Sequence, residues 1–287
     1  MRRTRTIRPP EKRGKTKAAG ASVTARSANS ASDVARPPRW RRWIERPLSA
    51  AIDLVFPPRC VACGGECETR RGAPLLCAAC DAALAISKGP VCPRCARNCS
   101  EADLPRGDCG ECRSRTLLFS AARTIGPYQD ELRQAVLKAK HAAYEPLARA
   151  LGRRLAEAVA RLPLAARPDV VVPVPMHWLK RLWRKTNPAS TIAQALAGEL
   201  QLKLASGALV CRRMLRRQAT LTPAERRENV RGGFGVSRWW NVTGKQVLLV
   251  DDVMTTGATA HEASRALLKA GATAVYVATV ARSSADF

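Results

Sequence analysis

Short apolar runs alternate with amphipathic stretches over the last two thirds of the chain. Residues 169–175 are a β-branched run that must end at its prolines, which predicts a buried strand entering a loop. Residues 247–250 and 274–280 predict two more buried strands. Helical spacing covers 129–162, with a break near 144–146, then 188–200 and 259–270. This alternation predicts an α/β fold, with a mostly parallel sheet covered on both faces.

The first 58 residues follow another pattern. Residues 1–38 are rich in Arg, Ala and Ser, which indicates a disordered basic tail, although an organellar transit peptide shares this composition. Apolar side chains at helical spacing predict a short helix and linker over 39–58. No apolar run reaches the roughly 20 residues of a membrane span, and no signal-peptide pattern follows the N-terminus. We expect a cytoplasmic protein without a membrane span.

Ten of the eleven cysteines lie within residues 60–112 and form two copies of one pattern. The second copy repeats the first at an offset of 32 residues: Cys60, Cys63, Cys67, Cys77 and Cys80 recur as Cys92, Cys95, Cys99, Cys109 and Cys112. A shared offset at five positions indicates a duplicated unit. No feature sends the chain to an oxidising compartment, so clustered C-x-x-C turns favour metal over disulfides.

Each copy, within a module over 59–114, can close one tetrahedral metal site from its two C-x-x-C turns. We assign one zinc ion to each copy, which leaves Cys67 and Cys99 over; the ligand sets are Cys60, Cys63, Cys77 and Cys80, and Cys92, Cys95, Cys109 and Cys112. An iron–sulfur cluster, or a pairing that takes one turn from each copy, stays open as an alternative. About fifty residues with few large apolar side chains cannot fold on a core alone, so the metal is expected to supply folding energy.

The charge of this module argues against DNA binding as its main role. The chain carries a formal net charge of +26, distributed as +11 on residues 1–59, −1 on 60–112 and +16 on 113–287. Eight thiolates and two zinc ions would bring the module to about −5. We therefore interpret it as structural or protein-binding. Phosphate-dependent DNA binding by an isolated 55–115 fragment would contradict this interpretation.

Residues 247–259 have the pattern of a ribose-phosphate site. The apolar strand delivers Asp251 and Asp252 to its carboxyl end, where ligands bind in open α/β sheets. A Thr-rich turn with Gly257 then leads into a helix, whose backbone amides and dipole favour an anion. Carboxylates suit ribose hydroxyls, and the loop suits the phosphate.

Three rival motifs do not fit this segment. A Walker A loop requires G-x-x-x-x-G-K-[ST] and a Rossmann turn requires G-x-G-x-x-G, and the chain has neither. A receiver domain also has paired acids after a strand, but it needs a further αβαβ run with a phospho-acceptor aspartate. Only Glu262 and Asp286 follow here.

The run Val-Leu-Leu-Val-Asp-Asp-Val-Met-Thr-Thr-Gly-Ala-Thr at 247–259 resembles the signature with which type I phosphoribosyltransferases bind 5-phosphoribosyl 1-pyrophosphate (PRPP). Over about residues 54–282 the chain resembles the ComF family, competence-associated proteins in which a cysteine-rich zinc module precedes such a domain. Further support comes from Phe-Pro-Pro-Arg-Cys at 56–60, Val-Pro-Val-Pro-Met-His at 172–177, and Gln218 with the run 221–234.

The resemblance implies a type I phosphoribosyltransferase-like domain over 115–287 that transfers phosphoribose to an unidentified acceptor with Mg²⁺. Asp251 and Asp252 would be catalytic and hold the ribose hydroxyls, residues 255–259 would hold the 5′-phosphate, and the Val-Pro-Val-Pro segment would form the pyrophosphate loop. Displacement at C1′ needs charge stabilisation and positioning more than a strong base. The implied PRPP-binding set is Val250, Asp251, Asp252, Val253, Thr255, Thr256, Gly257, Ala258, Thr259, Pro173, Val174, Pro175, His177, Arg184 and Arg217.

A basic belt lies between the expected pyrophosphate loop and the paired acids. Residues 180–238 hold 13 Lys and Arg against 3 Asp and Glu. Such a belt suits a polyphosphate or single-stranded DNA. The residues of interest are Lys180, Arg181, Arg184, Arg212, Arg213, Arg216 and Arg217. The family's link to DNA uptake implies competence or DNA-processing proteins as further partners.

Two departures from the family pattern bear on catalysis. Lys185 stands where the family has a glycine that lets the backbone approach pyrophosphate, and the segment before Gln218 lacks the expected threonine. A second interpretation therefore stands beside the enzyme: a non-catalytic protein that senses PRPP or a nucleotide while contacting single-stranded DNA or competence machinery. Selection of the acceptor is expected to fall to residues 113–145.

Overall fold

The computed structural model describes residues 57–67, 76–161, 167–176, 186–215 and 221–283. The basic tail, most of the segment 39–58, and the predicted site residues His177, Arg184 and Arg217 lie outside this part of the chain. Among the described helices, none combines the length and the apolar character that crossing a membrane requires.

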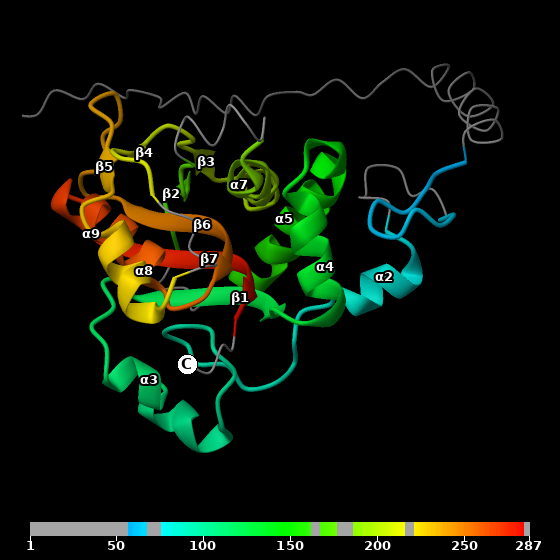
Figure 1. Cartoon of the computed structure of the whole chain (residues 1–287), viewed down its shortest axis with the longest axis horizontal. Coiled ribbons are helices and arrows are strands. Elements are labelled where there is room, and N and C mark those ends of the chain that lie inside the picture. The colour runs from blue at the N-terminus through cyan, green and yellow to red at the C-terminus, as the bar shows by residue number, and fades with distance from the viewer. Residues whose placement is uncertain (1–56, 68–75, 162–166, 177–185, 216–220, 284–287) are drawn as a thin grey trace, which may run out of the picture. The chain divides into compact units, whose positions relative to one another are not determined.

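A five-stranded parallel sheet forms the centre of the α/β domain (Figure 1). The strand order is β1 (Ala121–Pro127), β7 (Ala274–Arg282), β6 (Gln246–Met254), β2 (Val170–Pro173) and β3 (Lys203–Leu204). The three predicted strands are present, but β6 and β7 extend beyond their predicted ends. They remain paired as far as Met254 and Arg282, so Asp251 and Asp252 lie within β6 and not after it.

Both faces of the sheet are buried, which explains the continuous apolar runs. Along β6, Leu248 and Val250 belong to one core cluster, whereas Val247 and Leu249 belong to the other. Three helices cover the first face: α4 (Asp130–Ala139), α5 (Glu145–Val159) and α7 (Pro188–Glu199). The second face is covered by α9 (Ala258–Lys269). The predicted α/β class is confirmed.

The remaining elements lie between the predicted ones. The 3-10 turn η2 (Ala142–Tyr144) separates α4 from α5, at the predicted break. Strands β4 (Leu209–Cys211) and β5 (Phe234–Val236) form an antiparallel pair. Between them, helix α8 (Pro223–Val230) begins with a capping box of Thr222 and Glu225, in which each side chain accepts a backbone amide of the other residue.

The cysteine-rich module keeps its 32-residue repeat in its backbone. The bridge between Arg59 and Glu66 recurs between Val91 and Asn98. The left-handed position after each first C-x-x-C is Gly64 in one copy and Ala96 in the other. The module also contains α2 (Ala78–Ala83), the 3-10 turn η1 (Glu101–Arg106) and α3 (Gly110–Arg113).

The two copies of the repeat pack on opposite faces of the sheet. Val61 and Leu76 of the first contact the core under α4 and α5, whereas Ala96 of the second belongs to the core under α9. The chain between them crosses β1, where Ser87 N donates to Ile125 O (2.8 Å) and Ala122 N donates to Pro93 O (3.2 Å). This crossing covers the outer edge of β1, which would otherwise present unpaired backbone groups.

Candidate functional site

The paired acids lie at the carboxyl end of β6, and both are partly exposed. Asp251 Oδ1 accepts from Asp252 N (2.9 Å), and Asp252 Oδ1 accepts from Val253 N (2.8 Å). Burial and the neighbouring Asp252 carboxylate raise the pKa of Asp251 well above its ordinary value. Asp251 therefore takes up a proton more readily than an ordinary aspartate.

Lys140, a site residue that the sequence pattern did not indicate, lies 3.4 Å from Asp252, measured from Nζ to Oδ2. It follows the last turn of α4, a helix on the first face of the sheet. The ion pair holds the Asp252 carboxylate in place. Residues 113–145, which we expect to select the acceptor, include the edge strand of the sheet at 121–127. Their visible contribution to the acids is Lys140.

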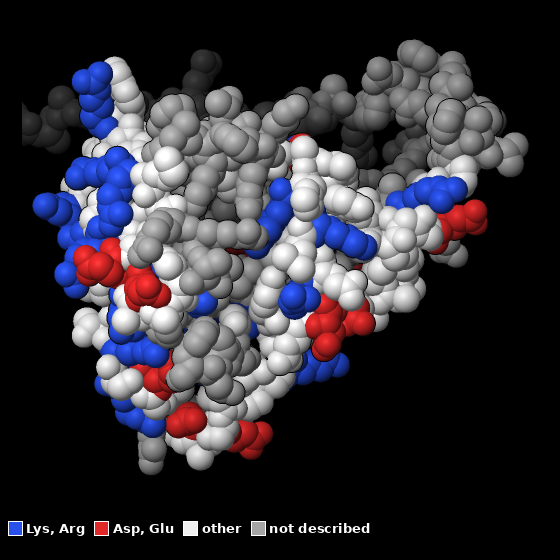
Figure 2. All heavy atoms as spheres, viewed as in Figure 1, with Lys and Arg blue, Asp and Glu red and all other residues white. Residues whose placement is uncertain are grey.

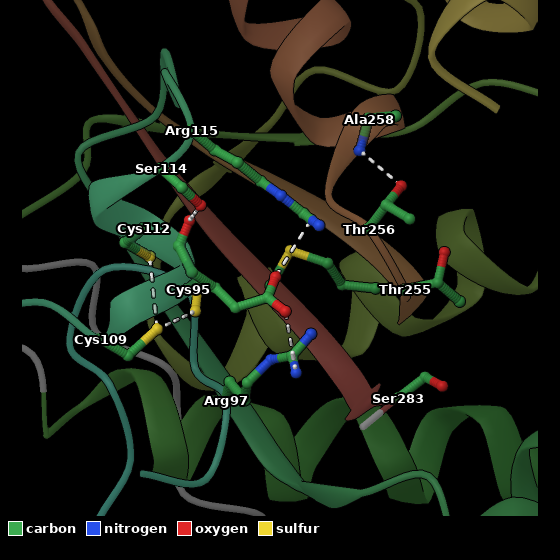
Figure 3. A network of polar contacts seen from close by, with 12 residues as sticks. Cys95, Arg97, Cys109, Cys112, Ser114, Arg115, Thr255, Thr256, Ala258 and Ser283 are labelled. Atoms are coloured by element: carbon green, nitrogen blue, oxygen red, sulfur yellow. Dashed lines mark hydrogen bonds and ion pairs between the residues drawn. The ribbon is translucent and has the colours of Figure 1, made fainter. Parts of the chain in front are cut away.

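The loop after β6 forms an anion cradle at the start of α9. Gly257 has φ of 77°, a left-handed conformation that turns the chain into the helix. Thr256 Oγ1 accepts from Ala258 N at 3.3 Å (Figure 3). The amides of the first helical turn and the helix dipole favour a bound anion here.

Arg282, at the end of β7, holds this loop from within the protein. It is 4% exposed, and its Nη1 donates to Met254 O (3.0 Å), to Ser283 O (2.7 Å) and to Thr255 O. Its Nε donates to Cys95 O (3.0 Å) in the second cysteine repeat. Burial lowers the pKa of Arg282, but a guanidinium stays charged at neutral pH. One side chain thus ties the loop after β6 to the cysteine module.

The Val-Pro-Val-Pro segment lies beside the acids. Pro173 of β2 pairs in register with Val250 of β6, and Val174 N donates to Val250 O (2.8 Å). Residues 173–175 therefore occupy the same carboxyl edge as Asp251 and Asp252. Asn187 Nδ2 donates to Val174 O (3.2 Å) and supports the loop from the start of α7.

The eight assigned cysteines form two separate clusters, one in each repeat. Within each cluster the Sγ atoms lie within 4.8 Å of one another. Individual Sγ–Sγ distances are 3.8 Å for Cys63–Cys77 and 3.7 Å for Cys95–Cys109. A tetrahedral site with Zn–S bonds of about 2.3 Å has sulfur–sulfur edges of about 3.8 Å, so both clusters fit zinc. The pairing predicted within each repeat is confirmed, and the interleaved alternative is wrong.

The two spare cysteines lie outside these clusters. Cys67 donates to Pro58 O from both its Sγ (3.6 Å) and its backbone amide (3.1 Å). In the second repeat, the backbone amide of Cys99 donates to the equivalent carbonyl, Pro90 O (3.1 Å). Burial raises the pKa of both thiols, which favours their neutral form. Their backbones stabilise the turns, and we assign them no ligand role.

Comparison with known proteins identifies both parts of the chain. A double zinc ribbon domain matches residues 51–115, and a phosphoribosyl transferase domain matches residues 189–286. DNA utilization protein YhgH of Escherichia coli K12 is 31% identical over 206 residues, which cover 70% of this chain and 88% of that protein. Competence protein F of Haemophilus influenzae is 28% identical over 228 residues, 78% of this chain and 96% of that protein.

A solved glutamine PRPP amidotransferase of B. subtilis, complexed with ADP and GMP, overlaps with 47% of this chain and 26% of its own, at 27% identity and a TM-score of 0.32. This partial overlap carries no argument. The extended similarity to the curated relatives, together with the zinc ribbon and the transferase domain in this order, is decisive. The chain belongs to the ComF family of competence-associated proteins, and its zinc ribbons precede a domain of the phosphoribosyltransferase fold.

Proposed function

We propose that the protein binds PRPP at the carboxyl edge of β6 and β2 and transfers its phosphoribosyl group to an acceptor during DNA uptake or the processing of internalised single-stranded DNA. The observation that carries this proposal is the meeting of three features at one sheet edge. These are the acids Asp251 and Asp252, the anion cradle at 255–259, and the loop at 173–175.

In the proposed complex the two carboxylates hold the ribose hydroxyls, and the cradle holds the 5′-phosphate. Backbone groups of 173–175 approach the pyrophosphate. Carboxylate oxygens are also donors that Mg²⁺ prefers, and the partly exposed pair fits this ion, which would neutralise charge on the leaving pyrophosphate. Lys140 fixes Asp252, so the protein contributes positioning and charge and not a strong base.

The test is calorimetric titration of the full chain with PRPP and Mg²⁺, followed by incubation with a panel of bases and measurement of pyrophosphate. Asp251→Asn combined with Asp252→Asn should abolish PRPP binding and leave the circular dichroism spectrum unchanged. Asp103→Asn with Asp108→Asn, which removes the same charge from the zinc-ribbon module, should keep the affinity. Retained affinity in the first variant would refute the site.

A second candidate is a protein that binds PRPP or a nucleotide without turnover and contacts single-stranded DNA. It is favoured by a surface on the β4–β5 side, where Trp239 is 79% exposed and the Arg238 guanidinium lies 4.7 Å from the centre of its ring. Arg212, Arg213, Arg227 and Arg231 are also exposed on β4 and α8 or next to them. Figure 2 shows basic side chains gathered along this side of the molecule.

Exposed aromatic rings among arginines suit stacked bases and a phosphate backbone. The names of the two relatives, DNA utilization protein and competence protein, agree with such a partner. Tight PRPP binding without pyrophosphate release for any acceptor would favour this candidate over the enzyme. Release that depends on one acceptor would favour the enzyme.

A further inference from the structure

A cavity of about 520 Å³ opens beside the phosphate loop. Its walls are residues 114–117 after α3, the side of α8 that carries Arg227 and Arg231, and residues 256–258 with the first turn of α9. Asp251 and Asp252 are not among its lining residues. The cavity therefore starts at the cradle of the proposed PRPP site and continues along α9, away from the ribose acids.

The lining is basic. Arg115 directly follows the module at 59–114 and ends the double zinc ribbon match, and its guanidinium points across the cavity toward Thr256 and Ala258 (Figure 3). It is held by an ion pair with Glu111 (3.2 Å). Arg227 and Arg231 are exposed on the opposite wall.

The acid that lines the cavity, Glu262, is already neutralised. Its Oε2 accepts from Arg265 Nη2 (2.7 Å) and from Gly232 N (3.2 Å), and its Oε1 accepts from Arg265 Nε (3.0 Å). Arg115 and Arg231 are also paired, with Glu111 (3.2 Å) and Glu228 (3.4 Å), but each guanidinium has five N–H donors and keeps some for a ligand. Together with Arg227 and the amino end of α9, these donors favour an anion in the cavity.

The volume exceeds what one phosphate group fills, since ligand cavities of about 300–1,000 Å³ hold molecules of cofactor size. A ligand whose first phosphate lies in the cradle can reach this space only with a group that is attached to that phosphate. PRPP has a terminal 5′-phosphate and leaves the space unused. A nucleoside 5′-diphosphate has the same ribose diol and 5′-phosphate, with one more phosphate beyond them.

We propose that this cavity binds the terminal phosphate of a nucleoside 5′-di- or triphosphate whose ribose and first phosphate occupy the PRPP site. Arg115, at the end of the double zinc ribbon match, and Arg227 and Arg231 of the α8 region hold that terminal phosphate. The proposal rests on the proposed PRPP site and names a further ligand class for it. It also gives the zinc-ribbon module a direct part in ligand binding.

The experiment compares AMP with ADP, which differ by one phosphate, by titration of the full chain loaded with zinc. We expect ADP to bind at least about tenfold more tightly than AMP, because charge-assisted hydrogen bonds to arginine are strong. ADP should also compete with PRPP. Arg115→Ala should remove most of the ADP advantage and leave AMP affinity unchanged.

Arg113→Ala is the matched control, because Arg113 is the last residue of α3, two positions before Arg115, but pairs with Asp103 and Asp108 and does not line the cavity. It should retain the ADP advantage. Arg231→Ala provides a second test on the opposite wall, with the melting temperature of each variant as a check of folding. Equal affinity for AMP and ADP in the wild type, or equal losses for both in Arg115→Ala, would overturn the inference. If neither PRPP nor AMP binds, the proposed function itself fails.

Discussion

Asp251 and Glu262 lie on consecutive elements, and their surroundings shift their pKa values in opposite directions. Burial and the Asp252 carboxylate raise the pKa of Asp251. Burial also acts to raise the pKa of Glu262, but the Arg265 guanidinium and the Gly232 amide outweigh it and lower that pKa below 4.5. The surroundings of Asp251 thus favour its protonated form more than in an ordinary aspartate, whereas those of Glu262 favour its ionised form.

We expect Glu262→Gln to destabilise the protein by about 1–2 kcal/mol near neutral pH, because Arg265 and the Gly232 amide lose an ionised acceptor. Because the pKa of Glu262 is lower in the folded protein than its ordinary value of 4.5, the ionised side chain stabilises the fold fully at pH values above 4.5. This stabilisation is lost as the pH falls through the pKa of the folded state. Urea unfolding of the wild type and of Glu262→Gln, at about pH 7 and about pH 3, measures this effect. The difference in unfolding free energy between the two proteins should be smaller at the lower pH. The control is Glu228→Gln, which replaces an exposed acid on α8 and should change the stability little. A loss of stability in Glu262→Gln that does not depend on pH would contradict this account.

At this scale the sequence could predict the residues whose partners are adjacent in the chain. Asp251, Asp252 and Gly257 share one strand–turn–helix unit, so their spacing alone defines a site. Lys140 and Arg282 were missed because each reaches the site from a distant segment, and neither has a local pattern that distinguishes it from a surface cation. A charged residue ending the apolar run of β7 was the one available signal for Arg282.

Among the elements, the two zinc ribbons offer equivalent sites with different neighbours. The second is bonded to the loop after β6 through Arg282 and packs Ala96 into the core that holds Met254 and Ala258. The first instead contacts α4 and α5: Lys138 Nζ donates to Ala62 O (2.8 Å), and Arg154 pairs with Asp81. Metal in the second ribbon should therefore matter more for ligand binding.

Cys95→Ser and Cys63→Ser, which replace equivalent ligands 32 residues apart, test this difference. Each should reduce the zinc content, as measured by elemental analysis. We expect Cys95→Ser to weaken PRPP affinity by on the order of tenfold, as loss of a supporting contact does, and Cys63→Ser to weaken it much less. Equal losses in the two variants would show that both ribbons act only through general stability.

Helices α5 and α7 meet at Gly152. A Cβ atom there would lie 2.5 Å from Ile192 O and 2.8 Å from Ala195 Cβ, so backbone must move. We expect Gly152→Ala to destabilise the protein by about 1–3 kcal/mol through overpacking, measured by denaturant unfolding. Gly198→Ala on α7, where a Cβ meets nothing within 4 Å, should instead stabilise by about 0.5–1 kcal/mol through helix propensity. Similar effects of the two changes would argue against the close approach.

The predictable strands were those with both faces buried, because their sequences are unbroken apolar runs. Strand β1 was missed: it carries Arg123 and Thr124, and part of its surroundings is the cysteine module, which pattern analysis treats as a separate region. Strands β3, β4 and β5 have two or three residues each, too few to show periodicity. The parallel pairing of β2 with β6, which completes the site, depends on strand order, and local sequence does not encode it.

At the scale of the whole molecule, the β4–β5 side presents the exposed ring of Trp239 beside Arg238. We expect Trp239→Ala to lower affinity for single-stranded DNA by about fivefold or more, because stacking of a base on an exposed ring contributes roughly 1–3 kcal/mol. Tyr144→Ala, which removes a 38% exposed ring next to α5, should leave affinity unchanged. Fluorescence anisotropy with a labelled oligonucleotide measures both, and binding should weaken steeply with added salt. Equal effects of the two substitutions would exclude the β4–β5 side as the DNA surface.

Strand order has a consequence for synthesis. Within the described sheet, β1 is the first strand to leave the ribosome, yet the strand that pairs with it, β7, is the last. The nascent chain must therefore carry an unpaired strand until residue 282 has emerged, a situation that favours pairing with other chains. Both zinc sites are complete once Cys112 has emerged, and the segment from Ser87 to Pro93 already covers one edge of β1. We expect the metal-loaded ribbons to fold during translation and to shield β1 until its partner arrives.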